Sequence, residues 1–169
     1  MKLTEQFLSQ LEAETARTRK TLERVPEGKD DWKPHDKSMP LGRLAGLVAG
    51  MPGWLALIIN QDDLDLNPPG GSNYSQKPLR TPAELVQALE EGAEKGRQAL
   101  ESTTEEHLQK PWRILVAGKV VSEQPRHIVI RDTFGHLAHH RAQLTVYLRL
   151  NDVPVPAIYG PSADDAHFA

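Results

Sequence analysis

The chain has 169 residues, a length typical of one domain and sufficient to bury a core without disulfides or a structural metal. Its 20 Lys and Arg and 23 Asp and Glu give a net charge of −3, and the basic residues are scattered, so we expect no nucleic-acid partner. The absence of cysteine excludes a disulfide framework, a thiolate metal site and a cysteine nucleophile. We expect a single domain over residues 1–169.

The N-terminal segment predicts a first helix. Its apolar residues recur on one helical face and the pattern stops at Val25–Gly28. Polar residues interrupt the segment throughout, so it lacks the apolar stretch of a signal peptide or a membrane span. We therefore expect a cytoplasmic protein with no membrane contact. The apolar positions are Leu3, Phe7, Leu8, Leu11 and Leu22.

A second helix is predicted after the polar link 29–37. Ser38 is expected to cap it, and Pro52 is expected to kink it because proline removes a backbone hydrogen bond. The following stretch 62–79, which contains two prolines and two glycines in succession, predicts a long loop. The apolar face of this helix carries Leu41, Leu44, Leu47, Val48, Met51, Leu55, Ile58 and Ile59.

Two more helices complete the predicted fold. Thr81–Glu84 is typical of a helix start, with proline at the first helical position and an acid at the third. The stretch 112–121 predicts an irregular or hairpin connection, and after Pro125 a last long helix runs to about Asn151. Four helices of this length predict an all-α fold, an antiparallel four-helix bundle, although the links do not determine its handedness.

Two histidines on the last helix form the candidate metal site. His136 and His140 lie four residues apart and flank the apolar stripe centred on Leu137, whereas His139 points toward solvent. A neutral imidazole is a good ligand for Zn, Ni, Cu or Fe, but a catalytic zinc normally has three protein ligands. The alternative is that both histidines are hydrogen-bonded polar residues at the edge of the core. Spacing alone favours this alternative, because such pairs also occur without a metal.

Several segments resemble the DinB/YfiT-like (damage-inducible DinB) superfamily of metal-site four-helix bundles. The run 136–150 is similar to the signature of the last helix in that family, and the terminal tract 153–165 is similar to its C-terminal motif. The resemblance covers nearly the whole chain. Its further segments are Asp31–His35, Leu41–Ala45 and Pro52–Trp54.

This resemblance implies an antiparallel bundle, frequently dimeric, in which three histidines hold a divalent metal ion. One comes from the second helix, and the pair from the last helix maps onto His136 and His140. Members include thiol S-transferases and isomerases that use low-molecular-weight thiols. We therefore expect a homodimer, a small-molecule ligand or thiol as partner, and Zn, Ni or Fe as the metal if one is bound.

The second helix departs from the family pattern at Leu47. This residue stands where the family has its first histidine ligand, and leucine cannot bind a metal. One hypothesis is a degenerate metal site with metal-dependent thiol transferase or hydrolase activity. The other is a non-catalytic dimeric module that binds a small molecule or a partner and holds no metal. The catalytic residues are unknown, and a replacement third ligand could come from His35, Asp62, Asp63 or His107.

Two further polar features have predicted structural roles. Arg141, next to His140, could hold an anionic substrate, but we favour an ion pair with a carboxylate on a neighbouring helix. Ser162 followed three residues later by Asp165 is typical of a capping arrangement, which predicts a turn in the C-terminal tract.

Overall fold

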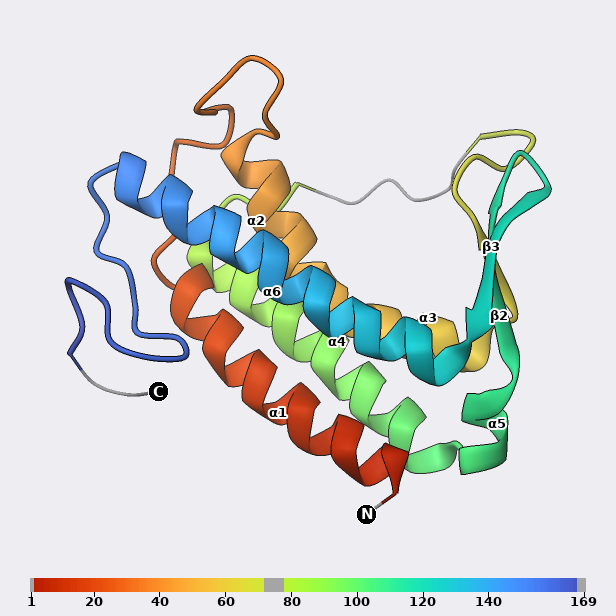
Figure 1. Ribbon diagram of the computed structural model, residues 1–169. Coiled ribbons are helices and arrows are strands. Elements are labelled where there is room, and N and C mark those ends of the chain that lie inside the picture. The colour runs from red at the N-terminus through yellow and green to blue at the C-terminus, as the bar shows by residue number, and fades with distance from the viewer. Residues whose placement is uncertain (1, 72–77, 167–169) are drawn as a thin grey trace.

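The computed structural model describes residues 2–71 and 78–166 and contains four long helical segments with a small sheet at one end (Figure 1). The second segment is one apolar stretch in three parts, since a 3-10 turn separates two α-helices. The helices are α1 (Leu3–Leu22), α2 (Leu41–Gly50), η1 (Met51–Gly53), α3 (Trp54–Asn60), α4 (Pro82–Ser102), α5 (Glu105–Gln109) and α6 (Arg126–Leu150). The strands are β1 (Asp63–Asp65), β2 (Pro111–Val116) and β3 (Lys119–Pro125).

The helix boundaries confirm two of the predicted local signals and contradict one. Thr81 Oγ1 accepts a hydrogen bond from the Glu84 amide at 3.2 Å, and the Glu84 carboxylate accepts one from the Thr81 amide at 3.1 Å. Pro52 lies in η1, where the predicted interruption of the second helix occurs. The prediction that Ser38 caps this helix is wrong. The helix begins later, with Pro40 at its N-cap, and the Ser38 amide instead donates to the His35 carbonyl.

The contacts between helices define an up-down-down-up order. Leu11 lies close to Gly96 and Arg19 pairs with Glu90, so α1 and α4 are antiparallel. In the contacts between α3 and α4, the residue numbers on the two helices increase together, and the same holds for the contacts between α1 and α6. The two helices of each pair are therefore parallel. The predicted antiparallel arrangement is therefore correct only in part. α3 ends beside the sheet, whereas α4 begins at the opposite end of the bundle.

Close packing between α4 and η1 depends on two glycines of α4. A Cβ atom on Gly96 would lie 2.9 Å from the Pro52 carbonyl oxygen, and one on Gly92 would lie 3.0 Å from the Gly53 nitrogen. Both distances are too short for a carbon atom, so only glycine permits this approach. The resulting contact holds the middle of the second helical segment against α4.

The core consists of two clusters along the bundle, and Trp54 packs against both of them. One is centred on α2 and the C-terminal half of α6, and the other on α3, the N-terminal half of α6 and the sheet. The stretch Leu41–Asn60 is long and apolar enough to cross a membrane by composition, as the core helix of a bundle also is. Half of its most apolar window is buried in the bundle, where α2 and α3 contact both α4 and α6.

The sheet corrects the all-α prediction. β2 and β3 form an antiparallel hairpin around Ala117 and Gly118, which both have positive φ, and β1 pairs in parallel with β2. The predicted connection over 112–121 thus takes the hairpin form. β1 lies within the predicted loop 62–79. The sequence did not predict this strand, because two of its three residues are aspartates, which are untypical of a strand. Residues 72–77 of that loop lie outside the described residues.

A buried arginine joins the sheet end to the bundle. Arg126, the first residue of α6, is 1% exposed. Its guanidinium donates to the carbonyl oxygens of Ile58 at 3.0 Å and Gln61 at 3.0 Å, and to Asp62 Oδ1 at 2.6 Å. It also donates to the Pro111 carbonyl at 2.7 Å. A single side chain therefore caps the C-terminal end of α3 and fixes the start of β2.

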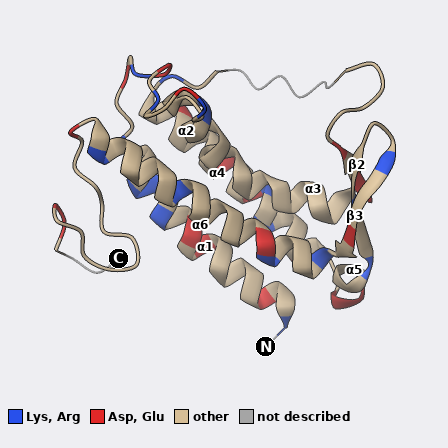
Figure 2. Cartoon of the chain, turned by 45° about the horizontal axis from the view of Figure 1, so that its top comes forward, with Lys and Arg blue, Asp and Glu red and all other residues tan. Residues whose placement is uncertain are grey.

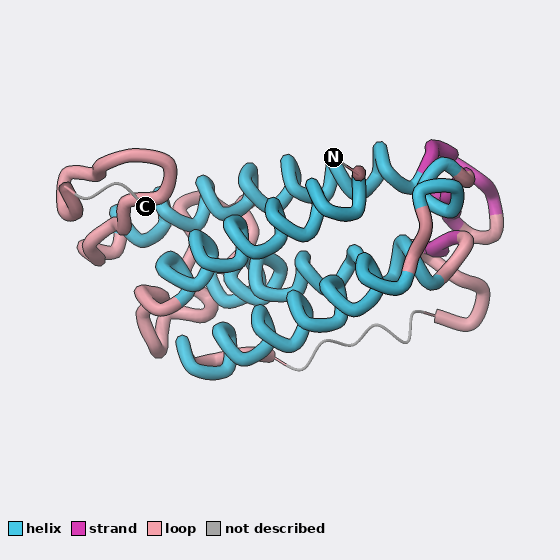
Figure 3. The backbone as a smooth tube through the Cα atoms, turned by 90° about the horizontal axis from the view of Figure 1, so that it is seen from below, coloured by secondary structure: helices cyan, strands magenta, loops and turns pink. Residues whose placement is uncertain are grey.

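The C-terminal tract folds back at the opposite end from the sheet, as Figures 1 and 3 show. Ser162 Oγ accepts hydrogen bonds from the amides of Asp164 and Asp165, which confirms the predicted capping turn. Arg149 on α6 pairs with Asp164 at 2.5 Å and holds the pKa of that carboxyl below its usual value. These contacts bring Tyr159 onto the bundle beside α1.

Candidate functional site

The two predicted site histidines are in direct contact on α6. The Nε2 atoms of His136 and His140 are 2.9 Å apart, and the ring centroids are 4.7 Å apart. His136 is exposed and His140 is half-buried. The structure therefore brings the predicted pair together, with both Nε2 atoms directed toward one point.

The hydrogen bonds around this pair form one continuous chain. His140 Nδ1 lies 2.8 Å from Gln143 Oε1, and because a carbonyl oxygen only accepts, the imidazole donates from Nδ1. A neutral His140 then accepts at Nε2, so His136 donates from its own Nε2. Gln143 Nε2 in turn donates to His139 Nε2 at 3.0 Å. Both Nε2 atoms of the pair therefore have a protein partner without a metal ion.

The surroundings of His136 favour its neutral form. Although His136 is exposed, partial desolvation of its ring against the bundle lowers its pKa, and the nearby imidazoles of His140 and His139 lower it further. The Trp54 ring at the start of α3 lies 5.7 Å from the His136 ring, centroid to centroid. A neutral imidazole is the form that either donates one hydrogen bond or binds a metal.

Leu47 lies on α2 at the level of the histidine pair. The Tyr147 hydroxyl donates to the Met39 carbonyl at 3.0 Å, while Trp54 contacts His136, so α2 and α3 run antiparallel to α6. Between these two contacts, this register places Leu47 opposite the turn that carries His140. Leu47 is half-buried and packs against the core. The position from which α2 could complete the site is therefore apolar.

The four possible replacement ligands are engaged elsewhere. Asp62 pairs with Arg126 at 2.6 Å and Asp63 with Arg113 at 3.0 Å. His107 Nε2 lies 2.8 Å from the Ile59 carbonyl oxygen, and His35 Nδ1 accepts from the Lys37 amide at 3.1 Å. Within residues 2–71 and 78–166, no group of three or more His, Cys, Asp or Glu is placed to hold a metal ion.

The opposite side of α6 carries a buried ion pair. Arg141 is 2% exposed and Glu14 on α1 is 5% exposed, and Arg141 Nη1 lies 2.7 Å from Glu14 Oε2. Thr18 Oγ1 accepts from the same nitrogen at 3.0 Å, and the Tyr159 hydroxyl accepts from Nη2 at 2.6 Å. Arg17 adds a second cation on Glu14 at 2.7 Å. The prediction that Arg141 pairs with a carboxylate on a neighbouring helix is confirmed.

The sequence contained a signal for this ion pair. Glu14 continues the apolar face of the first helix after Phe7 and Leu11, and a carboxylate on a buried face needs a charged or hydrogen-bonding partner. The buried contacts of Arg126 and the contact of Tyr159 with Arg141 were not predicted from the sequence. Nothing local distinguishes these two residues from exposed residues, because their partners come from distant segments. In Figure 2 basic and acidic residues are interspersed over the helices rather than gathered on one of them.

Comparison with known proteins agrees with this architecture. The sequence matches the DinB family over residues 1–167. No curated protein matches it. A DinB-like protein from Bacillus cereus ATCC 10987 is 18% identical with a TM-score of 0.70, and the match covers 92% of this chain and 97% of that one. The DinB-like protein YjoA from Bacillus subtilis is 20% identical with a TM-score of 0.65, covering 87% of this chain and 92% of that one.

At these identities the two solved structures show a shared fold, and the fold has the same four helical segments that the sequence predicts. The family match spans nearly the whole chain and includes both the histidine pair and the terminal tract. The chain belongs to the DinB family.

Proposed function

We propose that this DinB-family protein acts as a non-catalytic, dimeric interaction module that works without a tightly held metal ion. The observation that carries the proposal is the set of side chains at the family site. Two imidazoles are hydrogen-bonded to each other, and the apolar Leu47 occupies the level from which a third ligand would come.

The chemistry of the donor set supports this proposal. A catalytic zinc site normally has three protein ligands and one open position, and hydrogen bonds behind the ligands hold them in place. Here a second-helix ligand is replaced by leucine, so a bound ion would depend on two imidazoles and water. Such an ion would also have to displace the proton that joins the two Nε2 atoms. The residues present therefore fit a weak, exchangeable ion better than a catalytic one.

A second candidate function, metal-dependent thiol transferase or hydrolase activity, is favoured by one distance. Two imidazole nitrogens on one tetrahedral zinc ion lie roughly 3.3–3.4 Å apart when each bond is about 2.0–2.1 Å long. The two Nε2 atoms are 2.9 Å apart, so a small separation of the rings would let the pair bind an ion. His136 and His140 would hold such an ion, which would supply a Lewis acid.

The decisive experiment compares three proteins by elemental analysis and by calorimetric titration with Zn²⁺ and Ni²⁺. We expect the native protein to carry substoichiometric metal and to bind added ion weakly. Leu47→His places a third imidazole at the level of the pair, so it should bind both ions at least about tenfold more tightly. His140→Ala should abolish the remaining binding. His139→Ala is the matched control, because this histidine lies on the same helix outside the pair.

Stoichiometric metal in the native protein that is lost in His140→Ala would overturn the proposal and support the metal-dependent alternative. The dimer is tested separately by light scattering coupled to size-exclusion chromatography, where a monomer at all concentrations would contradict the dimeric part. Thiol transfer measured in metal-loaded native protein would contradict the non-catalytic part.

A further inference from the structure

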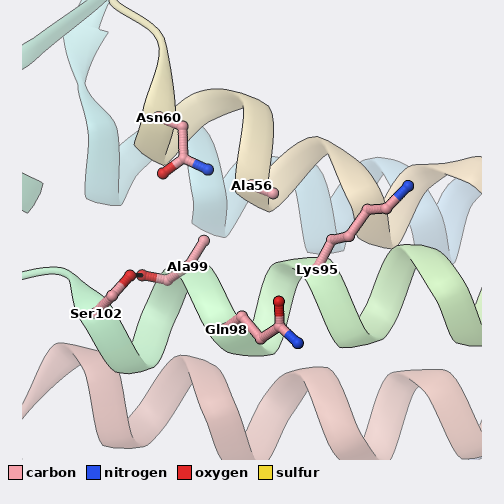
Figure 4. Close-up of a pocket in the computed structure, with 6 residues that line it drawn as sticks. All are labelled: Ala56, Asn60, Lys95, Gln98, Ala99 and Ser102. Carbon is pink, nitrogen blue, oxygen red and sulfur yellow. Dashed lines mark hydrogen bonds between the residues drawn. The ribbon is translucent and has the colours of Figure 1, made fainter.

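A polar groove lies on the other side of α3 from the histidine pair. Trp54 contacts α6, whereas Ala56 and Asn60 face α4 across the groove. Figure 4 shows Lys95, Ala99 and Ser102 on α4 opposite Ala56 and Asn60 on α3. Ala56 and Ala99 have short side chains, so they leave space between the two helices.

The groove continues toward α5 as a second hollow. The two hollows share Asn60 and Ser102 and have volumes of about 290 and 440 Å³. Each hollow is open to solvent, and each has a volume near the lower end of the range for small-molecule sites, which is roughly 300–1,000 Å³. Lys95 lies at one end of the groove and Lys110 lines the part next to α5.

The lining of this groove is positively charged in a protein that is acidic overall. None of the described residues that line it is acidic, although the chain has more Asp and Glu than Lys and Arg. Neither Lys95 nor Lys110 forms an ion pair with a described residue. Two lysines therefore face the same groove without a counter-charge from the protein.

The nearby carboxylates are already committed to other partners. Arg97 holds Glu94 at 2.6 Å and Glu101 at 2.5 Å. Glu105 accepts hydrogen bonds from the amides of Leu3 and Thr4 at the start of α1, at 3.1 Å each. These three acids of α4 and α5 are thus bound to other groups, and neither lysine forms an ion pair with them.

The centre of the groove offers hydrogen-bonding groups rather than charge. Thr103 lines it, and its hydroxyl is buried without a partner among the described residues. His107 donates from Nε2 to the Ile59 carbonyl, so its Nδ1 remains as a possible acceptor. The C-terminal ends of α3 and α4 also lie here, and their carbonyl groups disfavour an anion. A ligand should therefore carry its negative charges at its ends.

We propose that the groove between α3, α4 and α5 binds a small elongated dianion, with one anionic group near Lys95 and the other near Lys110. The seven helical steps from Lys95 to Ser102 span about 10 Å of α4, and Lys110 lies beyond them. A linear dicarboxylate is the simplest molecule of this shape and charge. This site does not depend on the histidine pair, so the metal titrations do not test it and its failure leaves the proposed function unchanged.

The test is a calorimetric titration of the full-length native protein with suberate and sebacate at low ionic strength. Octanoate and the uncharged diol of the same length are the matched ligands. We expect saturable binding of at least one dicarboxylate, weaker binding of octanoate and none of the diol. Added NaCl should weaken the binding, because the lysines are exposed.

Lys95→Gln and Lys110→Gln should each weaken dicarboxylate binding about three- to fivefold, the effect expected of a partly exposed ion pair. Lys119→Gln on the hairpin is the control and should bind as the native protein does. Both test residues are exposed, so the variants should retain the native circular dichroism spectrum. Absence of saturable binding, equal binding of octanoate, or unchanged affinity in either groove variant would overturn the proposal.

Discussion

His140 and Arg141 are consecutive residues of α6, yet they lie in opposite environments. Arg141 is buried against α1, where Glu14, Thr18 and Tyr159 surround its guanidinium. His140 lies on the α2 side, and within the described part of the chain its hydrogen bonds join it only to residues of α6 itself. The guanidinium on one side of the helix is thus bound by two distant segments, α1 and the C-terminal tract, whereas the imidazole on the other side is hydrogen-bonded to neither.

This contrast separates a polar group that stabilises the fold, Arg141, from one whose removal should change the stability little, His140. A buried charge needs partners that are fixed by the fold, and removing one of them leaves the other uncompensated. Among the described residues, the hydrogen bonds of the histidine pair stay within α6, so its loss should leave the bundle intact. The following predictions test this difference, beginning with the largest effect.

Replacing Arg141 by methionine should lower the free energy of unfolding by about 3 kcal/mol, because Glu14 would remain buried without its main partner. His140→Gln at the next position should change it by less than about 0.5 kcal/mol. Urea denaturation of both variants measures the difference. Adding Glu14→Leu to Arg141→Met should recover much of the loss. Equal effects at the two positions would mean that the two sides of α6 do not differ in this way.

Tyr159→Phe should destabilise the protein by about 1 kcal/mol. The change removes the hydroxyl that accepts from Arg141 and donates to Glu14 but keeps the ring beside Arg17. The estimate is modest because the Tyr159 side chain is 62% exposed. The midpoint of thermal unfolding is the measurement. An unchanged midpoint would show that the C-terminal tract adds nothing to the ion pair.

Gly135→Ala should stabilise the protein by about 0.5–1 kcal/mol. Gly135 lies within α6 next to His136, and a Cβ atom there would meet nothing within 4 Å, so the gain is that of replacing a helical glycine. Gly96→Ala is the matched variant and should destabilise, because its Cβ would meet the Pro52 carbonyl. Denaturation of both variants tests whether α6 is open to solvent at Gly135 and closely packed against no other segment there.

The smallest predicted effect concerns acid stability. Arg149 holds the pKa of Asp164 below its usual value, so the carboxylate is favoured in the folded state. Its contribution is fully present above the unfolded pKa near 4 and is lost as the pH falls through the lower folded value. Asp164→Asn should therefore flatten the loss of stability in this acidic range and leave the slope near neutral pH unchanged. Unfolding midpoints measured against pH for both proteins provide the comparison.

The sequence predicted the helices well because helix formation depends on local periodicity and on boundary residues. Thr81, Glu84 and Pro52 act on backbone groups within a few residues, and the structure confirms all three roles. The predicted cap at Ser38 was wrong, because Pro40 is the N-cap of that helix, and β1 was not predicted. A strand of three residues forms only because β2 is beside it, and no local sequence pattern predicts such a partner.

The candidate site was predicted in part for the same reason. The spacing of His136 and His140 placed them on one face of α6, and their contact at 2.9 Å follows from that spacing. Whether a third ligand joins them depends on how other segments are placed. His35, Asp62, Asp63 and His107 were equivalent candidates in the sequence, and the fold gives each of them a different partner.

The sequence by itself determined the helical segments, the histidine pair and membership of the DinB family, because these depend on residues close together in the chain or on a pattern that spans it. Only the tertiary structure decided the up-down-down-up order, the sheet and the ion pair between Glu14 and Arg141, which are 127 residues apart. The physical reason is that local hydrogen bonds and periodicity act over a few residues. The partner of a buried charge is selected only when distant helices pack.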